Sequence, residues 1–420
     1  MVYLLEDHEL PLVSVTAMLR TDTAHDPPEL TGLASITGAL LRSGGTEALK
    51  PAALDAELEF MASAIESSIG EENGTVSMTT LNRNLDKTLR LFVDVIRSPG
   101  LDQGRLDLLK KQTIEALKRQ NDDPKGIAAR EYRRALYGNH PFGRVATIET
   151  VSRIRREEVQ SFYLHSVQPT GLILAVSGDF ARDKMIDQLE SLLGNWQGSS
   201  QSLPAVRPPE TTPVKRVLQA RKQVSQSVVK MGHFGIEKNN PDQYAIRVLD
   251  YILGGGFTSR LTQEIRSNRG LAYHAGSRFE IGRNFPGIFT AETETKSAST
   301  ATAISLMEEI IAGLTREPVS QEELSLAKES IVNSFIFGFT RADSIVSQQA
   351  RLEFFNYPAG YLENFRDRIA AVTADDVLRV ARKYLHPDAM TIMVVGDDSK
   401  FDQPLTRFGE VREIKLENFK

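Results

Sequence analysis

Two side chains suited to binding a peptide stand seven residues apart in the second half of the sequence. Arg266 and Tyr273 lie in residues 254–277, GGGFTSRLTQEIRSNRGLAYHAGS. A guanidinium donates several hydrogen bonds in a fixed geometry and a phenol donates one, so the pair can hold the carbonyl groups of a peptide. The chain has seven histidines, no two of them at the spacing of metal ligands. This pair is therefore the strongest candidate for chemistry.

The element that must position Arg266 is a short helix. Leu261 and Ile265 stand four residues apart and form an apolar stripe on a helix predicted over residues 259–268, which Gly270 ends. Arg266 falls in its last turn, where a cation is favourable by roughly 0.3 to 1 kcal/mol through the helix dipole. The position alone thus allows a structural role as well as a functional one.

Tyr273 begins the next element, which is predicted to be a strand. A half-buried strand tyrosine whose hydroxyl finds a partner is an ordinary structural feature, so the tyrosine has a second explanation too. His274 follows directly, and the alternation of a strand predicts that it points to the face opposite Tyr273. We therefore expect His274 to take no part in the site.

Apolar periodicity predicts a mixture of strands and long helices on both sides of a Pro- and Ser-rich stretch. The predicted helices span residues 84–97, 104–120, 241–253, 297–315 and 321–337, and the predicted strands are LVSVTAMLR, NGTVSMTTL, VSQSVVKMGHFG and GIFTAETE. Residues 159–179 and 377–397 both show a helix, a Pro-containing turn, an apolar strand and a closing Gly-Asp, which indicates an internal repeat.

This order predicts an α+β fold of two homologous domains, each a mostly antiparallel sheet with helices packed on one face. The predicted domains are residues 1–200 and 214–420, joined by a linker at residues 201–213.

Composition excludes several functions. Lys and Arg number 50 against 55 Asp and Glu, for a formal charge of -5, so the chain lacks the basic surface of a nucleic-acid-binding protein. No apolar run reaches the ~18 residues of a membrane span. The absence of cysteine removes disulfides and thiolate chemistry. The opening residues predict strand, turn and strand at once, which fits a cytoplasmic protein or a periplasmic one whose leader has been removed.

Several segments in order resemble the pitrilysin/insulinase family of zinc peptidases. They are DHELPLVSV, GLASITGALLRSGGTE, YGNHPFGR, the two strands that close on Gly-Asp, and GGGFTSRLTQEIRSNRGLAY, and together they cover nearly the whole chain. The family is known for two homologous α+β domains. Its catalytic members carry His-x-x-Glu-His on the first long helix, where two His bind zinc and the Glu acts as general base.

The zinc motif is absent from the matching segment. Ser35, Gly38 and Ala39 stand where the resemblance places His, Glu and His. Glu115 falls about where the remaining glutamate ligand is expected, but one carboxylate does not hold a catalytic zinc, and a solvated helix glutamate explains it better. The resemblance therefore implies that this chain binds neither a metal nor another cofactor.

Arg266 and Tyr273, by contrast, match the family's Arg and Tyr residue for residue. The resemblance implies that Tyr273 donates a hydrogen bond to the scissile carbonyl or oxyanion and that Arg266 holds the substrate backbone. In the family's two-subunit branch a metal-free subunit supplies such a pair in trans. We therefore expect a partner subunit with His-x-x-Glu-His and zinc, and oligopeptide substrates.

A second function stays open. The chain resembles catalytically silent family members as well, so it also fits a structural, assembly or peptide-binding subunit. That alternative requires neither Arg266 nor Tyr273. Inactivity of the chain alone is expected under both hypotheses.

Overall fold

The protein consists of two units, and each unit is assembled from stretches that are not continuous in sequence. A computed structural model describes residues 1–198 and 203–416. Unit 1 comprises Met1–Leu117, Arg144–Arg207 and Gly338–Asn356; unit 2 comprises Lys118–Gly143, Pro208–Phe337 and Tyr357–Lys420. Each half of the chain therefore contributes one segment to the unit formed mainly by the other half.

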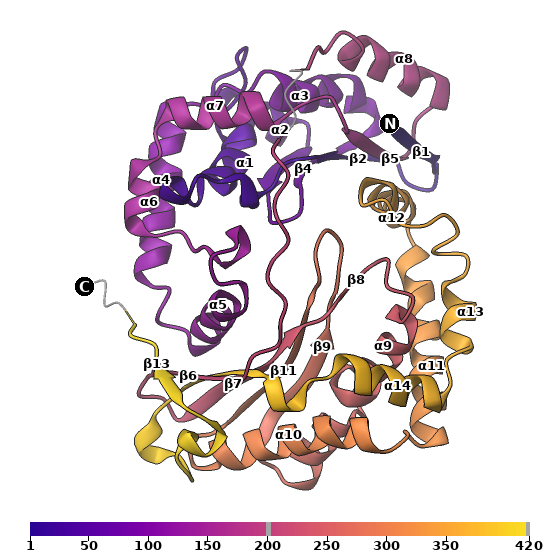
Figure 1. Ribbon diagram of the computed structural model, residues 1–420. Helices are drawn as coiled ribbons and strands as arrows, with labels where there is room; N and C mark the ends of the chain where they lie inside the picture. The colour runs from indigo at the N-terminus through magenta and orange to yellow at the C-terminus, as the bar shows by residue number, and fades with distance from the viewer. Residues whose placement is uncertain (199–202, 417–420) are drawn as a thin grey trace. The chain divides into compact units, whose positions relative to one another are not determined.

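Unit 1 contains a five-stranded sheet in the order β1-β5-β2-β4-β3 (Figure 1). Its strands are β1 (Val2–Glu6), β2 (Leu12–Leu19), β3 (Ala64–Ile69), β4 (Gly74–Leu81) and β5 (Ile173–Gly178). Its helices are α1 (Leu33–Ser43), α2 (Pro51–Phe60), α3 (Leu85–Arg97), α4 (Gln103–Lys118), α6 (Ile148–Arg153), α7 (Arg156–Ser166), α8 (Arg182–Leu193) and α12 (Ala342–Phe354). β1 and β5 are parallel, and the other neighbours are antiparallel.

Unit 2 contains a six-stranded sheet in the order β13-β6-β12-β7-β11-β9. Its strands are β6 (Arg216–Arg221), β7 (Gln226–Phe234), β9 (Ala272–Phe279), β11 (Ile288–Lys296), β12 (Thr391–Gly396) and β13 (Val411–Glu413), beside the short pair β8 (Ile236–Glu237) and β10 (Ile281–Gly282). Its helices are α5 (Pro124–Tyr137), α9 (Gln243–Asp250), α10 (Thr300–Arg316), α11 (Gln321–Ile336), α13 (Phe365–Ala370) and α14 (Ala374–Tyr384).

The two sheets have the same plan apart from β13. Without β13, each sheet begins with a parallel pair, β1 with β5 in unit 1 and β6 with β12 in unit 2. The three pairings that follow in each sheet are antiparallel. The prediction of an α+β fold with two mostly antiparallel sheets is confirmed. The predicted boundaries at residues 200 and 214 stay a prediction; residues 199–202 lie outside the described residues, and residues 203–215 contain neither helix nor strand.

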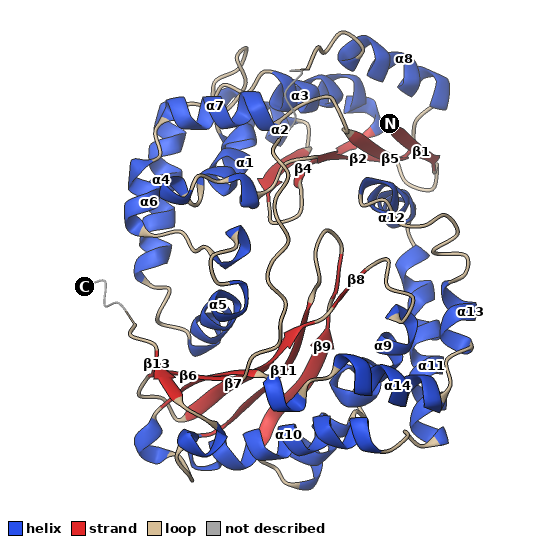
Figure 2. Ribbon diagram, viewed as in Figure 1, coloured by secondary structure: helices blue, strands red, loops and turns tan. Residues whose placement is uncertain are grey.

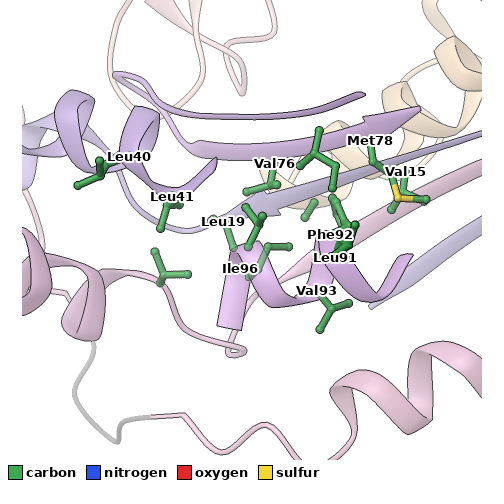
Figure 3. Packing of buried hydrophobic residues seen from close by; sticks show 14 of the residues in the cluster. Val15, Leu19, Leu40, Leu41, Val76, Met78, Leu91, Phe92, Val93 and Ile96 are labelled. Carbon is green, nitrogen blue, oxygen red and sulfur yellow. The ribbon is translucent and has the colours of Figure 1, made fainter. Parts of the chain in front are cut away.

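Alternating side chains place the core of each unit on one face of its sheet, under most of the helices (Figure 2). In unit 1, Val15 and Leu19 of β2 pack with Val76 of β4 and with the apolar stripe of α3, which includes Phe92 and Ile96 (Figure 3). These side chains are almost entirely buried. The spacing of four residues between Phe92 and Ile96 keeps both on the buried side of the helix.

The opposite face of each sheet carries a helix from the other half of the chain, which corrects the expectation of helices on one face only. In unit 2, Ile127 and Tyr132 of α5 pack on Val228 of β7 and Met393 of β12, apart from the main core. In unit 1, α12 packs on β5 and β1 (Figure 2). Periodicity reveals that a helix is amphipathic but does not identify the sheet that covers it.

Candidate functional site

The segment before Arg266 runs along the edge of the sheet of unit 2. α9 continues as a π-helical stretch, η5 (Tyr251–Gly255), and a second one, η6 (Thr262–Asn268), follows a short loop. Both lie against β9, the edge strand. A side chain at Gly254 would overlap the backbone nitrogen of Ser277 and lie 2.6 Å from the carbonyl carbon of Gly276. Glycine at this position therefore permits the close approach of helix and strand.

A β-bulge lies at Tyr273. Along β9, His274 pairs with Glu294 of β11 and Ala272 pairs with Thr295, so Tyr273 has no residue opposite it. The bulge interrupts the alternation on which the expectation for His274 rests, and both side chains are exposed, so the orientation of His274 away from Tyr273 stays a prediction. Bulges frequently redirect a side chain next to a functional site, and here the residue left without a partner is the tyrosine.

The guanidinium of Arg266 contacts two exposed aromatic rings. Its Cζ atom is 5.1 Å from the ring centre of Tyr273 and 5.5 Å from that of Phe257. Tyr273 is 82% exposed and Phe257 77% exposed. Among the described residues, the Arg266 guanidinium and the Tyr273 hydroxyl have neither a hydrogen-bond partner nor an ion-pair partner. The donors of both side chains are therefore available to a ligand.

The carboxylates Glu264 of η6 and Glu292 of β11 have partners other than Arg266. Glu264 accepts hydrogen bonds from Asn268 at 2.8 Å and from Arg269 at 2.7 Å, and these bonds lower its pKa. Glu292 pairs with Lys230. Burial raises the pKa of Glu292, but the pairing with Lys230 outweighs burial, so the pKa of this carboxyl is lowered. Neither carboxylate pairs with Arg266, which is half-buried, so its guanidinium carries no ion pair among the described residues.

Two interactions fix η6 in place. The hydroxyl of Thr262 donates a hydrogen bond to the carbonyl of Ala275 on β9, at 3.0 Å. Arg260 forms two parallel bonds with the carboxylate of Glu323, the third residue of α11, at 2.7 and 2.9 Å. The helix that carries Arg266 is thus attached both to the strand that carries Tyr273 and to the neighbouring helix, which keeps the pair together.

The segment that corresponds to the zinc motif lies on α1 in unit 1. Ser35 is exposed, Gly38 is buried and Ala39 is half-buried. A side chain at Gly38 would overlap the backbone nitrogen of Ile69 on β3, and the carbonyl of Gly38 accepts a hydrogen bond of 2.6 Å from Ser67 of the same strand. The backbone of β3 therefore occupies the space that a glutamate side chain would need.

The side chains at these positions do not fit a zinc site. Ser35, Gly38 and Ala39 offer one hydroxyl and no imidazole or carboxylate, and Glu115 is an exposed residue of α4. Within residues 1–198 and 203–416, no group of three or more His, Cys, Asp or Glu side chains is arranged to hold a metal ion. The candidate site of this chain is thus the pair on unit 2.

Over the same described ranges, no helix is both long enough and apolar enough to cross a membrane.

Family models match most of the chain. The model described as Insulinase (Peptidase family M16) matches residues 2–147, and the model described as Peptidase M16 inactive domain matches residues 153–331. The chain belongs to the M16 insulinase family. The second of these M16 matches contains both Arg266 and Tyr273.

Relatives within M16 have names of two kinds. An uncharacterized zinc protease of Mycobacterium leprae is 26% identical over 72% of this chain and 69% of its own length. A protein of Helicobacter pylori named a non-peptidase homolog, YmxG, is 22% identical over 94% of this chain and 91% of its own. Both names are therefore found on relatives that are 22 to 26% identical to this chain over the aligned residues.

The fold is that of solved M16 structures. A peptidase M16 inactive domain from Pseudomonas fluorescens superposes with a TM-score of 0.85 at 23% identity, covering 94% of this chain and 95% of that one. A protease from Helicobacter pylori gives 0.82 at 18% identity, covering 93% and 96%. These similarities establish the architecture of the whole chain.

Sequence reasoning missed Phe257. This residue follows three glycines and belongs to no apolar repeat, so periodicity assigns it no place in a core. The sequence does show an isolated aromatic residue in a glycine-rich loop nine positions before Arg266, and that signal could have marked Phe257 as a candidate. The structure brings it to the same guanidinium as Tyr273.

Proposed function

We propose that this chain is the metal-free subunit of a two-subunit zinc peptidase that cleaves oligopeptides, and that it supplies Arg266 and Tyr273 in trans. The observation that carries the proposal is that the two side chains stack at 5.1 Å with all their hydrogen-bond donors unoccupied, while the corresponding zinc helix has no ligands. A partner M16 subunit with His-x-x-Glu-His would hold the zinc and with it activate the attacking water.

The roles of the two side chains follow from their donors. Tyr273 donates its O–H to the scissile carbonyl oxygen and keeps that bond as negative charge develops there, which lowers the barrier to attack. Arg266 donates N–H groups to carbonyls of the substrate backbone and remains charged at any working pH. Contact with the Tyr273 ring keeps the guanidinium beside the phenol, so both donors reach one extended segment of peptide.

The test is reconstitution. The chain is mixed with an M16 homologue from the same source that carries His-x-x-Glu-His, and cleavage of a quenched fluorescent oligopeptide is followed. We expect activity in the mixture that neither protein shows alone. Tyr273→Phe should lower kcat by about 10²- to 10³-fold, the usual effect of removing one oxyanion donor. Arg266→Ala should chiefly raise KM.

Matched variants make the outcome specific. Tyr244→Phe changes a phenol of α9 outside the site, and Arg269→Ala removes a neighbouring cation that pairs with Glu264. Both should leave cleavage within about twofold of the wild type, as ordinary surface or distant changes do. Full activity of Tyr273→Phe in the mixture would exclude the proposed role.

The second candidate is a catalytically silent assembly or peptide-binding subunit. It is favoured by the relative named a non-peptidase homolog, which aligns with 94% of this chain. Under this function the chain joins a partner, but the activity of the mixture does not depend on Tyr273. The Tyr273→Phe measurement therefore separates the two candidates directly.

A further inference from the structure

Phe257 has an unusual position for a phenylalanine. Its ring is 77% exposed, and its described ring contact is with the guanidinium of Arg266. The loop around it is nevertheless well defined, because the N–H of Gly256 donates to the carbonyl of Tyr251 at 3.0 Å and the N–H of Ser259 donates to that of Gly256 at 3.1 Å. The backbone thus holds the aromatic ring at the surface.

We propose that Phe257 is a positioning residue for Arg266 and that its exposed ring forms an apolar subsite for a substrate side chain. This inference rests on the proposed function. An arginine without an ion-pair partner samples many rotamers, and fixing them for binding costs free energy. Contacts with two rings restrict the guanidinium in advance, so Arg266 is oriented before a peptide arrives.

The same geometry points to a class of substrate. Phe257 and Tyr273 contact one guanidinium, so a peptide whose carbonyl binds Arg266 passes close to two exposed aromatic rings. Contact with a large apolar or aromatic side chain removes part of this surface from water. We therefore infer a preference for peptides that carry such a side chain near the cleaved bond.

The first experiment measures the position of Arg266 without any activity. Phenylglyoxal modifies accessible arginines, and peptide mapping by mass spectrometry gives the rate at Arg266 relative to other arginines of the same sample. Phe257→Leu should raise this rate about two- to fivefold, the size expected for one exposed cation–π contact. Phe257→Trp, which keeps an aromatic face, should retain the wild-type rate.

A matched control is available in unit 1. Phe60 is 89% exposed and lies on the last turn of α2. Phe60→Leu makes the same chemical change and should not alter the modification of Arg266. An unchanged rate in Phe257→Leu, or the same rise in Phe60→Leu, would overturn the positioning role whether or not the reconstituted mixture cleaves peptides.

The second experiment measures substrate preference in the reconstituted mixture. Two quenched peptides are compared that differ only in Phe or Ala next to the cleaved bond. The wild type should prefer the Phe peptide in kcat/KM, and Phe257→Leu should reduce this preference about two- to fivefold, mainly through KM. Phe257→Trp should restore it.

The outcomes separate the two proposals. If the wild-type mixture is inactive, the proposed function fails, and arginine modification alone decides the role of Phe257. If the mixture is active and sensitive to Tyr273→Phe but its preference is the same in Phe257→Leu, the proposed function stands and the apolar subsite is wrong.

Discussion

α1 with β3 in unit 1 and the segment η5–η6 with β9 in unit 2 are built in the same way. In each, a helical segment lies against the edge strand of its sheet, and a glycine of that segment touches the strand backbone. A side chain at Gly38 would overlap the nitrogen of Ile69, and one at Gly254 would overlap the nitrogen of Ser277. Close approach of helix and strand is thus common to both units.

The two regions differ in regularity. β3 pairs with β4 without interruption, and α1 is an ordinary α-helix. β9 contains a bulge at Tyr273, and η5 and η6 are π-helical. Both kinds of irregularity are frequent at functional sites. The region of unit 1 is thus regular and lacks metal-ligand side chains at the zinc-motif positions, whereas the region of unit 2 departs from regular geometry where Arg266 and Tyr273 lie.

The largest expected effect concerns Gly38 and Gly254, the glycine in each region that touches strand backbone. Gly38→Ala and Gly254→Ala should each lower the free energy of unfolding by at least about 3 kcal/mol, because the methyl group meets backbone that cannot move aside. Gly313→Ala on α10 is the control, since nothing lies within 4 Å of the added atom. It should stabilise the helix by about 0.5 to 1 kcal/mol. Urea unfolding measures all three.

The same packing predicts the result of rebuilding the zinc motif. Replacing Ser35 and Ala39 by His and Gly38 by Glu should unfold the unit and should not create a zinc site, because position 38 faces the β3 backbone. A folded triple variant that binds zinc stoichiometrically would show that β3 moves readily, and the comparison between the regions would lose its structural basis.

Much of the fold could be predicted from the sequence because local signals and the global arrangement agree. The predicted helix at 84–97 is α3, and the strand predicted from NGTVSMTTL is β4. Arg266 and Tyr273 could be singled out by residue type, spacing and family resemblance. Their stacking shows that the two side chains meet in space. The spacing of seven residues across a break between helix and strand could not establish that contact.

The rest depends on long-range contacts that no local pattern encodes. The helices α5 and α12 each pack on the sheet of the unit formed mainly by the other half of the chain, and amphipathic spacing does not reveal such an exchange. The bulge at Tyr273 follows from how β9 pairs with β11, so simple strand alternation does not hold across Tyr273 and His274. Phe257 was missed because its only described ring contact is with Arg266, nine positions later.

Asp26 near the start of α1 and Asp242 before α9 should respond to pH in opposite ways. Burial raises the pKa of Asp26 to about 6, against the hydrogen bonds that it accepts from the backbone N–H groups of Gly32 and Ala34 at the start of α1. A carboxyl with a raised folded-state pKa favours the protonated form. Unit 1 should therefore gain stability as the pH falls from about 6 to 4, by at most about 3 kcal/mol.

Asp242, before α9, should behave in the opposite way. Burial raises its pKa, but hydrogen bonds from Tyr384, Arg379 and Lys383 outweigh burial and hold the pKa below 3.8. Its contribution is present above pH 3.8 and is lost as the pH falls through the lower folded-state value.

Separate probes follow the two units. Trp196, the one tryptophan of the chain, reports on unit 1, and hydrogen exchange of β11 reports on unit 2. Asp26→Asn should abolish the gain between pH 6 and 4 in the fluorescence signal and leave the acid loss in unit 2 unchanged. If both probes respond alike to pH in the wild type, the contrast between the two aspartates is wrong.

The smallest expected effect concerns one hydroxyl in each region. Ser67 donates to the carbonyl of Gly38 at 2.6 Å, and Thr262 donates to that of Ala275 at 3.0 Å, so each bond attaches a helical segment to an edge strand. Ser67→Ala and Thr262→Val should each cost about 1 kcal/mol of stability. Their functional consequences should differ, because only Thr262 lies on the segment that carries Arg266.

Thr262→Val should therefore raise the phenylglyoxal modification of Arg266 and the KM of a reconstituted peptidase, whereas Ser67→Ala, at equal cost in stability, should change neither. Equal loss of stability in the two variants removes general unfolding as an explanation for any difference. A rise in Arg266 modification in Ser67→Ala would mean that the donors of unit 2 respond to the stability of the whole chain. In that case the attachment of η6 to β9 is not what holds Arg266 beside Tyr273.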